Sequence, residues 1–184
     1  MISGKVFLLP APTLAADWTE KMSRRVAEVE NCSVRVGRTF TVRSEYYNSS
    51  RLQYRGEDIL YEVCTQRGER SGRVVALVDH DCYGASLTFV FGQASLRGGC
   101  AFVALARLRN SFWGKPPDDS LFALRVVKEI VHELGHTWGL PHCADPKCVM
   151  HFSNTIADTD RKGPAYCAIC HSKRNSCGGL KPIP

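Results

Sequence analysis

The chain has 184 residues, of which 44% are hydrophobic and 23% are charged, and its formal net charge is +6. This composition is ordinary for a globular protein, and the length suffices for one domain with its own core, so disorder is a poor interpretation for most of the chain. No run of 18 apolar residues occurs, so we expect no membrane-spanning segment. No run of five basic residues occurs either, so we expect no nucleic-acid partner.

The nine cysteines are unusual for a chain of this length. Their number is odd, no secretion signal is apparent at the start, and one pair has the spacing Cys-x-x-Cys. These features favour reduced thiols and metal binding over a disulfide framework. A cytoplasmic location is therefore expected.

Hydrophobic periodicity predicts alternating strands and helices, which are typical of an α/β domain with a mixed sheet. The residues from Arg73 to Asp79 are almost wholly apolar, as in a central buried strand. The strands are expected at Lys5–Leu9, Ser33–Tyr47, Arg73–Asp79, Leu87–Gln93 and Ala101–Leu108, and the first helices at Asp17–Glu30 and Asp58–Thr65.

A long helix is expected next, because Pro116–Asp119 combines prolines and acidic residues that favour a helix start. An apolar stripe runs along it from Leu121 to Trp138, and Gly139 follows as the terminating glycine. The tail from Pro141 onward is rich in Cys, Pro, Gly and charged residues, so irregular structure is expected there. A tail of this length would need a cross-link to hold it in a compact domain.

The last turns of this helix carry His132-Glu133-x-x-His136, followed by Gly139 and His142. Residues i and i+4 share one helical face, so the imidazoles of His132 and His136 can reach one ion. Once the chain reverses at Gly139, His142 can supply the third ligand. Three protein ligands and an open position are typical of a catalytic zinc site. A purely structural zinc at the same histidines stays an alternative.

The chemistry expected of this site is hydrolysis by a zinc-activated water. Zinc lowers the pKa of its water from 15.7 toward about 7. Glu133 would act as the general base and then return the proton to the leaving amine. The sequence therefore favours a zinc-dependent hydrolase, with a peptide or protein as its expected substrate.

Four cysteines follow the histidines in two pairs, Cys143-x4-Cys148 and Cys167-x-x-Cys170. Two such pairs are typical of a closed tetrahedral zinc site, so a second, structural ion is expected. This ion would hold the tail against the helix and would fix His142, which adjoins Cys143.

An alternative is that a nearby side chain takes the place of one of these four zinc ligands. The candidates are His151, His171 and Cys177. The remaining cysteines lie in or beside expected strands and are interpreted as small buried hydrophobes. They are Cys32, Cys64, Cys82 and Cys100.

The string VHELGHTWGLPHCADPKCVMHF, followed by CAIC, resembles the archaemetzincins, a branch of the metzincin metallopeptidases. Segments 89–94 and 104–108 also look like strands of that family before its catalytic helix. The resemblance implies a single metzincin-like catalytic domain over residues 1–184. Residues 1–139 would hold a twisted mixed sheet and the active-site helix, and residues 140–184 a zinc-stapled segment.

The resemblance also implies roles for residues around the histidines. Met150 would be the Met-turn residue, packed beneath them. Leu87–Gln93 would be the antiparallel edge strand over the cleft, where Phe89, Phe91 and Gly92 would bind a peptide by strand addition. Some metzincins place a tyrosine two residues after the Met-turn methionine; here Phe152 stands there, so no tyrosine ligand is expected.

The leading prediction is a zinc metallopeptidase with two zinc ions per chain, a monomer in which the resemblance implies aminopeptidase-like activity. A second reading keeps the zinc scaffold as a peptide-binding module with little or no turnover, although an intact Glu133 argues against it. A zinc hydrolase acting on small amides is a third reading.

Overall fold

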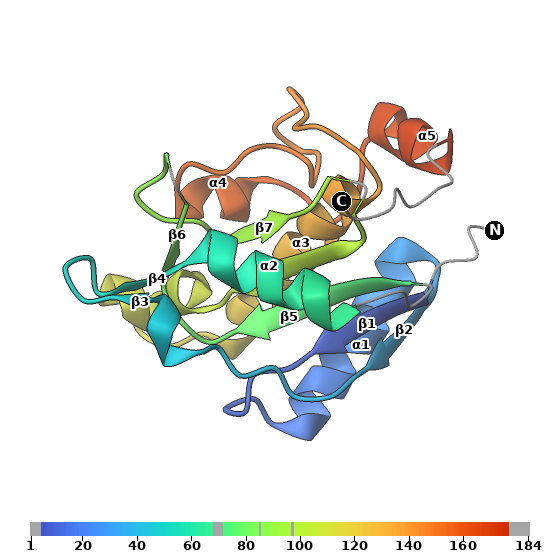
Figure 1. Ribbon diagram of the computed structural model, residues 1–184. Helices are drawn as coiled ribbons and strands as arrows, with labels where there is room; N and C mark the ends of the chain where they lie inside the picture. Colours follow the sequence, from blue (N-terminus) through green and yellow to red (C-terminus); the bar gives the residue numbers. More distant parts are fainter. Residues whose placement is uncertain (1–4, 68–71, 85, 97, 177–184) are drawn as a thin grey trace.

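A computed structural model describes residues 5–67, 72–84, 86–96 and 98–176, and the chain is of mixed α/β class (Figure 1). The main sheet has five strands in the order β2-β1-β5-β8-β7. Its first four strands are mutually parallel, whereas β7 runs antiparallel to β8 at the edge. The strands are β1 (Lys5–Leu9), β2 (Ser33–Val36), β5 (Arg73–Val78), β7 (Gly92–Ala94) and β8 (Cys100–Ala104).

The two faces of the sheet are covered by different helices, because successive side chains of a strand point to opposite faces. Alternate residues of β5 and β8 pack with α1 (Ala16–Glu30) and α3 (Asp119–Thr137) in one core. The intervening residues pack with α2 (Gly56–Arg67) in the other. Figure 1 shows α2 in front of the sheet and α1 and α3 behind it. Strand β7, at one edge of the main sheet, also contacts α3.

A second sheet of three short strands lies beyond the end of the main sheet. It joins β3 (Tyr47–Asn48), β4 (Gln53–Arg55) and β6 (Cys82–Tyr83). Among the described helices none is long and apolar enough to cross a membrane.

The expected strand Ser33–Tyr47 is wrong beyond Val36, where β2 ends. The backbone N–H of Gly37 still donates to Leu8 O at 2.8 Å, but the chain then turns inward. Phe40 is only 1% exposed and packs in the α2 core, and a short 3-10 helix (Ser44–Tyr46) follows. The alternating pattern after Val36 thus reflects burial of Phe40 and not a continuing strand.

Two other strand predictions were too long. Of Leu87–Gln93, only the end pairs with β8, and Val90 makes an isolated bridge to Cys82. Strand β8 ends at Ala104, and a 3-10 helix (Ala106–Leu108) follows.

The tail was expected to be irregular, but it contains two helices, α4 (Ile156–Arg161) and α5 (Ala168–Ser176). Helix α4 begins with a capping box in which Thr155 and Asp158 bond each other's backbone. The tail also contacts the body of the fold: Tyr166 Oη donates to Glu30 Oε1 at 2.7 Å, and Arg174 forms a buried ion pair with Glu30.

The cysteine interpretation needs one correction. Cys64 on α2 and Cys100 on β8 form a disulfide, with their Cα atoms 5.2 Å apart. They were expected to be separate buried thiols, but the packing of α2 on β8 brings them together. Cys32 and Cys82 are free thiols, Cys82 fully buried and Cys32 partly so.

Candidate functional site

Helix α3 positions the first candidate residues. Its start is capped by Asp118, whose carboxylate accepts the Leu121 N–H at 2.9 Å. Its end is closed by Leu140, whose N–H donates to Gly135 O at 3.0 Å while Gly139 adopts φ +92°. The chain reverses after this turn, as predicted from Gly139, and returns past the last turns of the helix.

The reversal brings His142 to His132 and His136. One ring nitrogen from each lies within 4.8 Å of the others, and the Nε2 atoms of His132 and His136 are 3.2 Å apart. Tetrahedral zinc with Zn–N bonds of 2.0–2.1 Å separates its nitrogen ligands by about 3.3 Å. The three imidazoles therefore fit one zinc ion.

Hydrogen bonds to backbone carbonyls fix the orientation of two rings. His132 Nδ1–H donates to Val149 O, and His136 Nδ1–H donates to Leu140 O, each at 2.7 Å. A ring that donates through Nδ1 presents the lone pair of Nε2, and such outer partners are typical of histidines that ligate metals. Burial lowers the pKa of all three histidines, that of His142 to about 4, which favours the neutral form that binds metal.

Glu133 lies in the cleft beside these rings and is only 4% exposed. Its Oε2 atom is buried and has no hydrogen-bond partner among the described residues. Burial raises the pKa of Glu133 well above its usual range; the negative charge of Glu129 adds to this rise, and the positive charge of Lys162 opposes it. A buried, unpartnered carboxylate is suited to accept a proton within the cleft.

Glu129 and Lys162 were not recognised in the sequence. Glu129 lies one helical turn before Glu133, and its Oε1 atom is 2.9 Å from Lys162 Nζ in a buried ion pair. The spacing of four residues between Glu129 and Glu133 could have indicated that both lie on one face of the helix. No motif marks Lys162, which lies in the tail.

The four predicted cysteines come together directly behind His142. One sulfur from each lies within 4.8 Å of the others, and the sulfurs of Cys143 and Cys167 are 3.8 Å apart. Tetrahedral zinc with Zn–S bonds of about 2.3 Å separates its sulfurs by about 3.8 Å. The Cys167 N–H also donates to Cys148 Sγ at 3.3 Å. This cluster fits a closed zinc site.

The alternative ligands lie elsewhere or outside the described residues. The Nδ1 atom of His151 is hydrogen-bonded to Cys143 O at 2.9 Å, and that of His171 lies 3.4 Å from the side-chain amide of Asn175. Neither histidine belongs to the cysteine cluster. Cys177 lies outside the described residues.

Met150 is fully buried beneath α3. A Cβ atom built on Gly135, between the two helical histidines, would overlap Met150 Sδ, so the methionine packs directly against that turn. Phe152 lies over the third histidine, its ring centroid 4.8 Å from that of His142. The Met-turn role of Met150 stays a prediction.

A cleft of about 760 Å³ runs past the histidines. Phe89, Phe91 and Gly92 line it on the side of the edge strand β7, and Glu133 lines it on the side of α3. A Cβ atom on Gly92 would lie 2.6 Å from Glu133 Oε1, so the strand passes directly over the carboxylate. The edge strand, the histidines and Glu133 therefore face one another.

Comparison with known proteins agrees with this geometry. Residues 26–175 match the model of Peptidase family M54. An archaemetzincin of Thermococcus kodakarensis is 43% identical over 129 residues, 69% of each chain.

Solved structures are similar over nearly the whole chain. A zinc-dependent peptidase from Methanocorpusculum labreanum has a TM-score of 0.85 at 26% identity, over 92% of this chain and all of that one. Archaemetzincin from Archaeoglobus fulgidus, complexed with malonate, has a TM-score of 0.77 at 34% identity, over 92% of this chain and 99% of that one. The chain is a member of Peptidase family M54, the family of the archaemetzincins.

Proposed function

We propose that this chain is a zinc-dependent metallopeptidase in which His132, His136 and His142 hold the catalytic zinc and Glu133 is the general base. One observation carries the proposal: three imidazole nitrogens lie within 4.8 Å of one another beside a buried carboxylate oxygen that lacks a partner among the described residues. Membership of a peptidase family and the zinc dependence named for the Methanocorpusculum labreanum relative support it.

Zinc, when bound, would polarise the scissile carbonyl and make water nucleophilic near neutral pH. The chain's own residues would do the rest. A peptide would pair with the exposed edge of β7, where main-chain hydrogen bonds give affinity. Glu133 would take the proton of the attacking water on Oε2 and deliver it to the leaving amine. Met150 would support the two helical histidines from below.

We also propose a second zinc ion, held by Cys143, Cys148, Cys167 and Cys170. Its role would be structural, because four thiolates leave no open position. Since Cys143 adjoins His142, this ion would set the position of the third catalytic ligand. Such a staple would add to the contacts that hold the tail against the body of the fold.

Three finer features complete the proposal: aminopeptidase-like activity, a monomeric state and a cytoplasmic location. The first is tested by comparing peptides with free and acetylated N-termini, since an aminopeptidase requires the free amine. The six free cysteines of the described residues support the location, whereas the Cys64–Cys100 disulfide counts against it.

The test of the peptidase assignment is the substitution Glu133→Gln, which keeps the shape of the side chain but removes the base. Cleavage of a peptide library is expected to fall by about 10²- to 10⁴-fold while zinc content is unchanged. The control is Glu28→Gln, the same substitution at an exposed position of α1. Unchanged cleavage by Glu133→Gln would overturn the base assignment. A wild-type chain that binds peptides without cleaving them would instead favour the peptide-binding module.

A further inference from the structure

One corner of the cleft differs chemically from the rest of its wall. The edge-strand side is largely apolar, with Leu87, Phe89 and Phe91 among its residues. The opposite side, where the chain passes from Met150 toward α4, contributes polar groups. We call this region the polar corner; it consists of Glu129, Ser153, Asn154 and Lys162.

Lys162 holds a positive charge in this corner although its side chain is 0% exposed. An ammonium group has three N–H donors. Its one short contact is Glu129 Oε1 at 2.9 Å, and His151 O lies at the longer distance of 3.5 Å. His132 Nδ1 is also 3.5 Å away but cannot accept, because its N–H already donates to Val149 O. The ammonium therefore keeps donor capacity.

Ser153 adds a second donor. Its Oγ atom is buried and has no hydrogen-bond partner among the described residues. Glu129 Oε1, by contrast, already accepts from Lys162 and also from Thr159 Oγ1 at 3.2 Å. Buried polar groups seek partners, so a corner with spare donors favours a ligand that brings acceptors.

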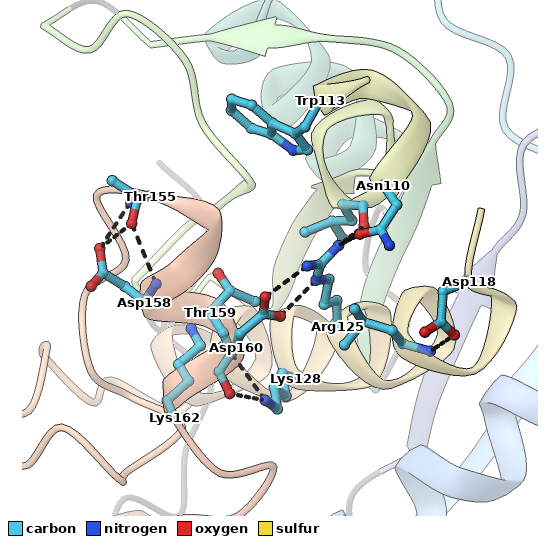
Figure 2. Close-up of polar contacts among 12 residues, drawn as sticks. Asn110, Trp113, Asp118, Arg125, Lys128, Thr155, Asp158, Thr159, Asp160 and Lys162 are labelled. Carbon is cyan, nitrogen blue, oxygen red and sulfur yellow. Dashed lines mark hydrogen bonds and ion pairs between the residues drawn. The ribbon is translucent and has the colours of Figure 1, made fainter. Parts of the chain in front are cut away.

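The corner is held rigid by the docking of α4 on α3, as Figure 2 shows. Arg125 forms a bidentate pair with Asp160, with N–O distances of 2.6 and 2.7 Å. Lys128 Nζ donates to the carbonyl oxygens of Thr159 and Asp160 at 3.0 Å each. These bonds fix the end of α4 and hence Lys162, which directly follows it. A charge held in place in this way can discriminate between ligands.

We propose that the polar corner is a substrate subsite for a side-chain carboxylate, so that the enzyme prefers peptides with Asp or Glu next to the scissile bond. Lys162 and Ser153 would donate hydrogen bonds to the carboxylate. The bond to be cut lies close by, because Glu129 precedes Glu133 by one helical turn. This inference rests on the proposed peptidase function, since it names the substrate class of the same cleft.

The test measures binding without turnover. Zinc-loaded Glu133→Gln protein is titrated with pairs of peptides that differ only in having Glu or Gln at one position. This position is moved in turn along each side of the bond that the wild type cuts. If the wild type cuts no bond, the position is moved along the whole peptide. At one position the Glu peptide is expected to bind at least about tenfold more tightly, the usual gain from a charge-assisted hydrogen bond. Adding Ser153→Ala should reduce this ratio severalfold, and adding Lys162→Met should abolish it.

The matched control adds Lys21→Met, which removes the same charge from the exposed surface of α1 and should leave the ratio unchanged. The Lys162→Met variant could fail to fold, because Glu129 would lose its cation. In that case the ratio of Glu-peptide to Gln-peptide affinity in the Ser153→Ala variant tests the subsite. A ratio near one at every position would overturn the subsite. So would a preference that survives both Ser153→Ala and Lys162→Met, because it would then come from the metal alone.

Failure of the subsite and failure of the proposed function give different results. If the wild type cuts peptides through Glu133 but Glu and Gln peptides bind with equal affinity, the proposed function stands and the subsite is refuted. A chain that cuts nothing but binds the Glu peptide more tightly, in a manner that depends on Ser153, retains the subsite and loses the function.

Discussion

Gly92→Ala tests whether the edge strand fixes the position of the Glu133 carboxylate, the proposed general base. The added Cβ atom would lie 2.6 Å from Glu133 Oε1 and 2.7 Å from Phe102 O, closer than the 3.0 Å that real Cβ atoms respect. Phe102 belongs to the buried strand β8 and cannot withdraw, so the edge strand β7 must shift away from it. The Glu133 carboxylate must also move by about 1 Å to restore ordinary contact with the new methyl group.

A displacement of about 1 Å in a catalytic group costs on the order of 10²-fold in rate. We therefore expect kcat to fall about 100-fold, with zinc content unchanged because no histidine is touched. The assay compares kcat, KM and bound zinc in wild type and variant. The control is Gly114→Ala, where a Cβ atom meets nothing within 4 Å and φ is +67°. It should cost about 1 kcal/mol of stability and leave kcat unchanged.

The reasoning is refuted if Gly92→Ala retains the wild-type kcat, because the carboxylate would then not need the position described above. A rise in KM with unchanged kcat would also contradict it, since that result places the effect in peptide binding.

Three further predictions concern metal binding and stability. Gly135→Ala should destabilise the chain by about 1–3 kcal/mol in thermal unfolding, because the new methyl group overlaps Met150 Sδ; an unchanged melting temperature would show that the methionine does not pack there. Burial lowers the pKa of His142 in the metal-free site to about 4, so its neutral form is kept down to about pH 5 and protonated only near pH 4 and below; zinc at the histidines should therefore be retained at pH 5 and released below about pH 4, and loss of this zinc already at pH 6 would contradict the assignment. Cys64→Ser should lower stability by about 2–4 kcal/mol and remove the response of unfolding to reductant, whereas a wild type indifferent to reductant would argue against the bond to Cys100.

Helix α3 and the clustering of the three histidines and of the four cysteines could be predicted because their signals are local. Helix α3 follows from its apolar stripe, and its ends follow from Asp118 and Gly139, which act within one turn. His132 and His136 share a helical face for the same reason. The chain reversal at Gly139 then leaves few positions for His142.

Other features depend on contacts between distant segments, which periodicity does not record. The alternation of Leu87–Gln93 resembles a strand, yet only Gly92 and Gln93 pair with β8, and Val90 makes an isolated bridge to Cys82. The Cys64–Cys100 disulfide joins residues 36 positions apart, and cysteine pairing cannot be deduced from spacing. Lys162 reaches Glu129 only because α4 docks on α3, so the polar corner was invisible in the sequence.

Zinc content and peptide cleavage, measured on the same sample before and after mild chelation, test the central claim most directly. We predict two zinc ions per chain, of which the three-histidine site releases its ion first, since the four-thiolate site is closed. Cleavage should stop with the loss of that first ion and return when zinc is restored. Cleavage that continues after the histidine zinc has been removed would contradict the account.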